Sequence, residues 1–182
     1  MYMKCDLSKY DNSWYDPGGS SFKRLVWYFV NLLVLKNRWN PINGIKVRTL
    51  RFFGAKIGRG VVIKPGVNVK YPWLLSIGDY SWIGEDVWID NLGMIRIGAH
   101  CCISQGAMLL TGNHNYKLTT FDLMVKPIIV GDGAWVGAKC IVCPGVTIER
   151  NSVLSVGAVA TKSTMPDSIY QGNPAVWKTD RY

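Results

Sequence analysis

Residues 131–163 read GDGAWVGAKCIVCPGVTIERNSVLSVGAVATKS, and an aliphatic side chain returns there at every sixth position. The same step of six recurs back to residue 57, with two steps of eight, from Val69 to Ile77 and from Ile89 to Ile97, and one long interruption between residues 109 and 127. The series consists of Ile57, Ile63, Val69, Ile77, Ile83, Ile89, Ile97, Ile103, Leu109, Val130, Val136, Val142, Ile148, Leu154 and Ala160. Fourteen of these fifteen residues are Ile, Leu or Val. A period of six fits neither an α-helix nor a single β-strand, so it indicates a structural repeat.

The repeat predicts stacked coils of parallel β-strands. Three hexads make one triangular coil of about 18 residues, and stacked coils bury a continuous core. Coils that start at Ile57, Ile77, Ile97, Val130 and Ile148 lie 20, 20, 33 and 18 residues apart. The third spacing leaves an insertion of about fifteen residues, which we expect to protrude as a loop. Glycine often follows the aliphatic position, and we expect it to serve corners that need a positive φ angle.

The chain length of 182 residues suits one domain with a well-buried core. We expect an arm and helices in residues 1–56 and the coils in residues 57–165. The protruding loop then occupies residues 112–127, and residues 166–182 form a C-terminal segment.

The region before the coils predicts two helices. Ser20 or Ser21 is suited to cap the first helix, which we expect to end before Pro41. A second short helix is expected over residues 45–53, with Lys46 on its basic side.

An apolar run at residues 25–35 lies within the first helix, flanked by basic and aromatic side chains. The run is shorter than the roughly 20 residues that a bilayer span requires. Two interpretations remain open for residues 21–39, namely packing on the protein's own core and peripheral contact with a membrane.

Charge and cysteine content restrict the partners. The formal net charge of +9 favours an anionic partner. No zinc-finger, basic-zipper or RNP pattern accompanies that charge, so we expect no nucleic acid. The odd count of five cysteines and the lack of a secretory signal at the polar N-terminus predict a cytoplasmic protein with reduced thiols. Cys101 and Cys140 fall on the small inward position of the repeat, so we interpret them as core residues and expect no metal.

Several motifs resemble a known family. The hexads, TGNH at residues 111–114, the run at residues 131–163 and GNPA at residues 172–175 resemble the left-handed β-helix acyltransferases. Within that group, FGAKIGRGVVIKPGVNVKYPWLLSIGDYSWIG at residues 53–84 is similar to colanic acid biosynthesis acetyltransferases and to maltose and galactoside O-acetyltransferases. The resemblance covers residues 50–178. It implies a mainly β fold, a left-handed parallel β-helix of about five coils with an N-terminal helical extension and one protruding loop.

The resemblance also implies a reaction, the transfer of acetyl from acetyl-CoA to a sugar hydroxyl in surface polysaccharide biosynthesis. A hydroxyl needs a base to attack a thioester, and histidine suits that task near neutral pH. His100 falls at a corner, where an exposed polar residue is ordinary, whereas His114 lies where the chain leaves the coils and matches the family's catalytic histidine. By the same resemblance, the Ala138 amide stabilises the oxyanion. Asp90 orients the sugar, with Asn91 beside it as a substitute.

The remaining site residues follow from the same resemblance. Tyr116 in the protruding loop is a further candidate for contact with the acceptor. The positions that match the family's coenzyme contacts are Trp135, Ala138, Ser155, Val156, Thr161, Lys162, Asn173, Pro174 and Lys178. The family is trimeric with sites between subunits. We therefore expect a homotrimer in which the side chains of residues 115–127 either cover a neighbouring subunit or fold back on their own coils.

Three alternatives stay open. One is an N-acetyltransferase acting on a nucleotide-linked amino sugar, because no residue decides between an oxygen and a nitrogen acceptor. Another is a non-catalytic β-helix that serves as a scaffold. The third is a metalloenzyme similar to the γ-carbonic anhydrases, which requires three converging histidines where this sequence has two. The sugar, and whether it is free, nucleotide-linked or lipid-linked, is left open by the sequence.

Overall fold

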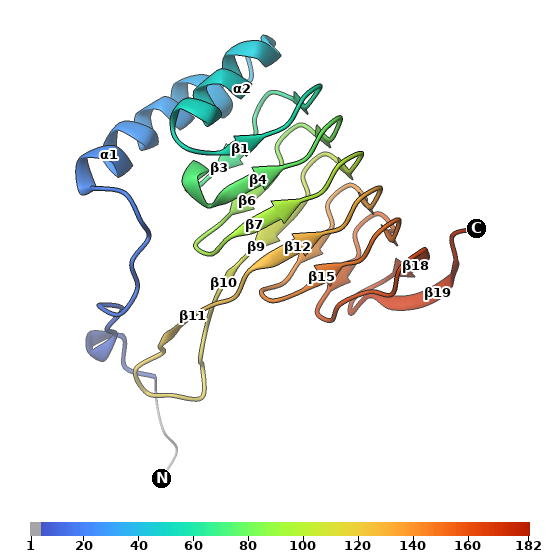
Figure 1. Cartoon of the computed structure of the whole chain (residues 1–182). Helices are drawn as coiled ribbons and strands as arrows, with labels where there is room; N and C mark the ends of the chain where they lie inside the picture. The colour runs from blue at the N-terminus through green and yellow to red at the C-terminus, as the bar shows by residue number, and fades with distance from the viewer. Residues whose placement is uncertain (1–4) are drawn as a thin grey trace.

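The computed structural model describes residues 5–182. Figure 1 shows a prism of stacked coils, with two helices over its first coil and a hairpin that leaves it midway. Sheet A contains β1 (Lys56–Ile57), β4 (Leu75–Ile77), β7 (Ile95–Ile97), β12 (Ile128–Val130) and β15 (Thr147–Ile148). Sheet B contains β2 (Val62–Ile63), β5 (Trp82–Ile83), β8 (Cys102–Ile103), β13 (Trp135–Val136), β16 (Val153–Leu154), β18 (Ser168–Gln171) and β19 (Val176–Asp180). Sheet C contains β3 (Asn68–Val69), β6 (Trp88–Asp90), β9 (Met108–Leu110), β14 (Ile141–Val142) and β17 (Val159–Ala160).

The core consists of the aliphatic side chains of the six-residue series. In sheet A, Ile57 pairs with Ile77, Ile77 with Ile97, and Ile97 with Val130. All are buried, and the other two sheets repeat this arrangement. Each such side chain contributes about 1.5–3 kcal/mol relative to an exposed one. The predicted parallel β-helix is confirmed, with five full coils and β18 as a sixth strand of sheet B.

The prism has three edges, two of which matter for the site. The B–C edge is the corner at which the chain passes from sheet B to sheet C, and the C–A edge is the corner at which it passes from sheet C to the next strand of sheet A. A 3₁₀ helix at Pro72–Leu74 lies on the C–A edge of the first coil.

The glycines that follow the aliphatic positions are needed for close approach between coils. A Cβ on Gly78 would lie 2.6 Å from the backbone nitrogen of Ala99 in the next coil. The positive φ angles fall two residues later, for example at Tyr80 and His100, both at 56°. Our expectation that these glycines themselves need positive φ is therefore wrong. His100, at its exposed corner, stacks on Tyr80.

We predict that Gly78→Ala lowers the free energy of unfolding by roughly 2 kcal/mol or more, because the new methyl group meets backbone that cannot move aside. The matched control is Gly44→Ala in helix α2 (Asn43–Phe52), where no atom lies within 4 Å of the added Cβ. That change should raise stability by roughly 0.5–1 kcal/mol through helix propensity. Chemical denaturation of both variants checks the pair, and equal effects would contradict the account.

The first helix packs on the prism by one side only. Helix α1 (Ser21–Val30) is capped by Ser20, whose hydroxyl accepts from the Lys23 amide, and a π-helical segment (Asn31–Leu35) extends it. Trp27 is buried against the first coil and donates its Nε1–H to the Val69 carbonyl at 2.9 Å. The opposite side of the helix exposes Phe22, Leu25, Phe29 and Leu33. Among the described residues 5–182, no helix is long and apolar enough to cross a bilayer.

Helix α2 buries a charged residue. Lys46 is 0% exposed, and its ammonium group donates to the Asn40 carbonyl at 3.1 Å. The expectation that Lys46 belongs to an exposed basic side is wrong, because α2 turns it inward beside Val47 and Leu50. Burial, with a smaller effect from Lys64, lowers the pKa of the Lys46 ammonium group.

We predict that Lys46→Met raises the free energy of unfolding by about 1 kcal/mol near neutral pH, because methionine fills the same space without a buried charge. The unfolded chain binds the Lys46 proton more tightly than the folded chain does. Wild-type stability should therefore rise as the pH increases toward the ordinary lysine pKa, and the advantage of the variant should shrink. Urea denaturation at about pH 7 and about pH 9.5 measures this difference. An advantage that does not change with pH would contradict the prediction.

Candidate active site

The interruption of the repeat is an antiparallel hairpin on the C–A edge of the third coil. Strand β10 (Gly112–His114) pairs with β11 (Leu123–Val125), and His114 lies opposite Leu123. Figure 1 shows the hairpin protruding from the prism toward the N-terminal arm.

The His114 ring is held by its own hairpin. Its Nδ1 lies 2.9 Å from the Phe121 carbonyl oxygen, and the two rings stack at 4.4 Å with an interplanar angle of 8°. A carbonyl oxygen only accepts hydrogen bonds, so this contact places the ring proton on Nδ1. The neutral ring then carries its lone pair on Nε2, which is the arrangement that a general base requires.

Two contacts of His114 were not predicted from the sequence. Phe121 has a φ angle of 52°, an uncommon value for a bulky residue, and its carbonyl bonds the histidine. Tyr10 lies 5.7 Å from the His114 ring, because the N-terminal arm follows the hairpin and the Asp6 amide donates to the Thr119 carbonyl at 2.8 Å. The only sequence signal was an aromatic residue in each segment, which does not specify a contact across about a hundred residues.

The sequence left open whether the hairpin side chains fold back on their own chain or cover a neighbouring subunit. Phe121 and the buried Leu123 fold back on their own chain. Tyr116 is 75% exposed and remains available to another molecule.

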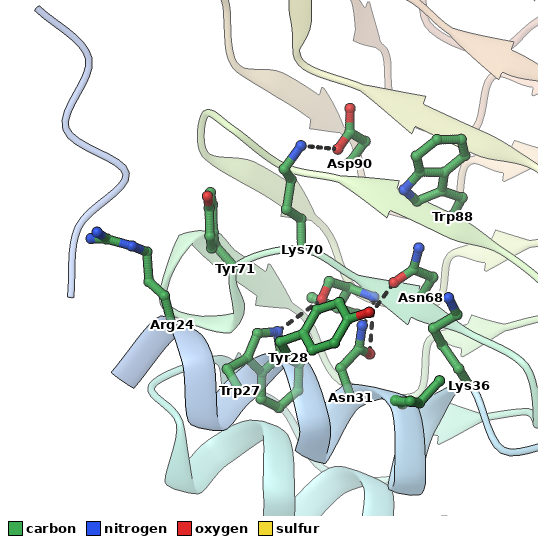
Figure 2. A pocket seen from close by; sticks show the side chains of 12 residues that line it. Arg24, Trp27, Tyr28, Asn31, Lys36, Asn68, Lys70, Tyr71, Trp88 and Asp90 are labelled. Carbon is green, nitrogen blue, oxygen red and sulfur yellow. Dashed lines mark hydrogen bonds and ion pairs between the residues drawn. The ribbon is translucent and has the colours of Figure 1, made fainter. Parts of the chain in front are cut away.

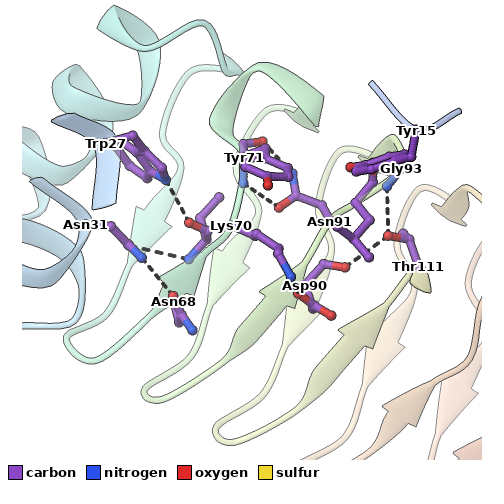
Figure 3. A network of polar contacts seen from close by, with 12 residues as sticks. Tyr15, Trp27, Asn31, Asn68, Lys70, Tyr71, Asp90, Asn91, Gly93 and Thr111 are labelled. Atoms are coloured by element: carbon purple, nitrogen blue, oxygen red, sulfur yellow. Dashed lines mark hydrogen bonds and ion pairs between the residues drawn. The ribbon is translucent and has the colours of Figure 1, made fainter. Parts of the chain in front are cut away.

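Asp90 lies on the same edge of the prism as His114, one coil earlier. Its carboxylate forms an ion pair with Lys70 at 3.1 Å. Its backbone carbonyl accepts the Thr111 hydroxyl at 2.9 Å, just before the hairpin (Figure 3). Three residues of extended chain, roughly 10 Å, lead from Thr111 to His114.

Asn91 is placed differently from our expectation. Its side chain is 0% exposed, accepts from the Tyr71 amide and donates to the Tyr71 carbonyl (Figure 3). It also donates to the Leu74 carbonyl at 3.1 Å. All of these contacts are to backbone of its own chain. Asn91 therefore holds backbone together at the C–A edge, and its buried amide is not exposed to an acceptor.

Part of the predicted coenzyme set forms a row along the B–C edge. Ala138, Val156 and the Asn173–Pro174 pair occupy this edge on three successive levels. The Gly157 amide donates to the Ala138 carbonyl at 2.9 Å, and the Val159 amide donates to the Gly172 carbonyl at 2.9 Å. Within residues 5–182, the Ala138 amide donates no hydrogen bond to a backbone carbonyl. It therefore differs from the neighbouring amides of Gly137 and Lys139, which donate to Leu154 and Gln105.

The rest of the set lies beside this row or away from it. Trp135 and Ser155 flank the B–C edge, with Trp135 exposed and bonded through Nε1 to the Ser104 hydroxyl at 2.8 Å. Lys178 is exposed on β19. Thr161 and Lys162 are exposed after β17, on the C–A edge.

His114 and Ala138 of one chain lie at opposite ends of sheet C. Ala138 lies at the corner before β14. The Lys139 amide donates to the Gln105 carbonyl, so this corner stacks on the corner before β9 in the preceding coil. His114 follows β9, beyond the other end of the sheet. Five residues of strand between these corners span roughly 16 Å. The two groups of a single chain therefore do not meet at one reacting carbon atom.

The cysteines of the repeat lie where the pattern places them. Cys101 and Cys140 are buried in the core, and burial raises the pKa of both thiols. Residues 5–182 contain no cluster of three or more His, Cys, Asp or Glu side chains arranged to hold a metal ion.

Comparison with known proteins identifies the family. No family model matches the chain. The Escherichia coli K12 protein named colanic acid biosynthesis acetyltransferase WcaF is 40% identical over 161 residues, covering 87% of each chain. The chain belongs to the hexapeptide-repeat acetyltransferases.

Solved structures of hexapeptide-repeat acetyltransferases share the fold. The acetyltransferase VCA0836 from Vibrio cholerae O1 biovar eltor, complexed with acetyl coenzyme A, matches with a TM-score of 0.81 at 21% identity, over 91% of this chain and 92% of its own. A galactoside acetyltransferase in complex with coenzyme A matches with a TM-score of 0.78 at 22% identity, over 88% and 82%. The family expected from the sequence motifs is confirmed.

Proposed function

We propose that the protein transfers acetyl from acetyl-CoA to a sugar hydroxyl in surface polysaccharide biosynthesis. The observation that carries the proposal is the His114 ring, whose Nδ1 is fixed on the Phe121 carbonyl so that Nε2 is left as the base. The name of the 40% identical relative supports a polysaccharide acceptor, and the solved complexes support the coenzyme.

The reaction follows from these groups. His114 Nε2 takes the proton of the acceptor hydroxyl while its oxygen attacks the thioester carbonyl and forms the new C–O bond. The Ala138 amide stabilises the negative charge on the tetrahedral intermediate. The C–S bond then breaks, and the imidazolium returns its proton to the departing sulfur. The products are an acetyl ester and the free thiol of CoA.

The coenzyme is proposed to lie along the B–C edge. Ala138 and the exposed Val156 lie on this edge, with Trp135 and Ser155 at its side and Asn173–Pro174 toward its end. Further coenzyme contacts are proposed for Thr161 and Lys162, which lie on the C–A edge, and for Lys178, which lies on β19. Positively charged side chains suit the phosphates of CoA.

A homotrimer is proposed because one chain separates the two catalytic groups. In a closed ring of subunits, the C–A edge of each chain faces the B–C edge of its neighbour. His114 of one subunit and Ala138 of the next then serve a single thioester. The exposed Tyr116 on the hairpin is proposed to contact the acceptor or the neighbour at this junction.

Asp90 is proposed to orient the acceptor, since its carboxylate lies one coil from the hairpin and pairs with Lys70. We also propose that the protein acts in the cytoplasm, with peripheral membrane contact through residues 21–39. The exposed apolar row Phe22, Leu25, Phe29 and Leu33 supports this contact.

Measuring thiol release from acetyl-CoA tests the function. The protein is assayed against free, nucleotide-linked and lipid-linked sugars, together with the matching amino sugars. We expect release with sugars that offer only hydroxyl groups. Release with amino sugars alone would replace the proposal by N-acetylation, and no release above hydrolysis would refute it.

A further inference from the structure

A cavity of about 390 Å³ lies between helix α1 with its π-helical extension and sheet C of the first two coils. Figure 2 shows Lys70 and Asp90 at one end, Trp88 and Tyr71 on the walls, and Arg24 and Lys36 on the helical side. The cavity meets the C–A edge at Asp90, whose carbonyl accepts the Thr111 hydroxyl, and roughly 10 Å of extended chain leads from Thr111 to His114. The cavity and the base therefore lie on the same edge of the prism.

The helical side of the cavity carries a regular row of side chains. Arg24, Tyr28, Leu32 and Lys36 recur at every fourth residue and all line the cavity. Residues at this spacing lie along one side of a helix. Positive charges therefore stand at both ends of the row, with an aromatic and an apolar side chain between them.

The charges around the cavity are not balanced. The lining includes three cations and a single carboxylate, that of Asp90, which pairs with Lys70. Arg24 bonds only neutral groups, the Gly19 carbonyl at 2.7 Å and the Ser21 hydroxyl at 3.0 Å. Among residues 5–182, no carboxylate lies within ion-pair distance of Lys36 or Arg24. Two positive charges are therefore available to a ligand.

The walls suit a sugar or a base. Trp88 is partly exposed on the outer face of sheet C, and Tyr71 lies on the C–A edge. Aromatic faces pack against the apolar faces of sugar rings, while cations bind phosphate oxygens through charge-assisted hydrogen bonds. A neutral sugar alone leaves two cations without a partner.

We propose that this cavity binds the phosphate or diphosphate group through which the acceptor sugar is attached to its carrier. Lys36 and Lys70 are the phosphate contacts, Trp88 packs on the adjoining ring, and Arg24 stands at the far end of the helical row. The inference rests on the proposed transfer to a sugar and adds the acceptor's class, a glycosyl phosphate or diphosphate. A nucleotide and a polyprenyl carrier share this chemistry, and the experiment distinguishes them.

The experiment is calorimetric titration of the full chain with saturating CoA, so that the coenzyme site is already filled. The probes are inorganic pyrophosphate, uridine diphosphate, farnesyl diphosphate and the neutral methyl galactoside. We expect pyrophosphate binding to weaken about tenfold in Lys36→Gln and further in Lys36→Gln/Lys70→Gln, and to weaken as salt is added. Lys56→Gln, an exposed lysine on β1 of sheet A, is the matched control and should bind like the wild type.

The relative affinities of the probes identify the carrier and test the inference. Tighter binding of uridine diphosphate than of pyrophosphate supports a nucleotide carrier, and tighter binding of farnesyl diphosphate supports a lipid carrier. Pyrophosphate that binds Lys36→Gln and the wild type equally, or diphosphates that bind no better than methyl galactoside, would overturn the inference. These titrations need no turnover, so their result is separate from the thiol-release assay that tests the proposed function.

Discussion

His114→Asn should lower kcat for acetyl transfer by about 10²–10⁴-fold while CoA binding is retained. Asparagine can still donate its amide to the Phe121 carbonyl and so hold the hairpin in place. It has no lone pair basic enough to accept the hydroxyl proton. Thiol release from acetyl-CoA with the best acceptor measures the loss, and calorimetry measures CoA affinity.

The matched control for this variant is His100→Asn. His100 lies on an exposed corner at a φ of 56°, a conformation that asparagine tolerates. We expect unchanged turnover. Turnover in His114→Asn equal to that in His100→Asn would remove His114 from the mechanism.

Ala138→Pro should lower kcat by about 10²–10³-fold, because it deletes the one N–H group proposed to hold the oxyanion. The prism itself indicates that proline fits this corner. Pro65 occupies the equivalent position of the first coil, where its carbonyl accepts the Asp86 amide just as the Ala138 carbonyl accepts the Gly157 amide. Each is followed by a residue at positive φ, Gly66 at 80° and Lys139 at 56°.

Glu85→Pro is the control at the same corner of the second coil. The Glu85 carbonyl also accepts an amide, that of Gly106 at 2.8 Å, and Asp86 follows it at a φ of 56°. This variant should fold and turn over like the wild type. If both proline variants lose activity together, the loss reflects disruption of the backbone at this corner, and the oxyanion assignment fails.

The repeat alone was sufficient to predict the prism, because a period of six with insertions only between coils stacks equivalent positions in columns. Ile57, Ile77, Ile97 and Val130 lie in one column as the spacing required. The reason for the glycines was predicted incorrectly. Crowding between coils at Gly78 depends on the neighbouring backbone, which a single-residue preference does not describe.

Only those features of the candidate site that depend on the repeat could be located from the sequence. His114 stood out because it lies where the hexads break, and the hairpin at residues 112–125 agrees with the expected protrusion. The contact of Tyr10 with His114 and the cavity beneath α1 depend on how the irregular arm and the helix pack on the prism. Such contacts between distant segments leave no periodic signal in the sequence. Asn91 was misjudged for the same reason. It is polar and adjacent to Asp90, but its side chain is buried and bonds the Tyr71 backbone, which the sequence does not reveal.

The central claim is that each site combines His114 of one subunit with Ala138 of its neighbour. The most direct measurement is complementation between His114→Asn and Ala138→Pro chains, expressed together with different tags and purified through both. Any mixed ring of three contains one junction with both wild-type groups, so the account predicts about a third of wild-type activity. His114→Asn mixed with the double variant should stay inactive. Mixed assemblies of the two single variants that remain as inactive as each variant alone would contradict the shared site.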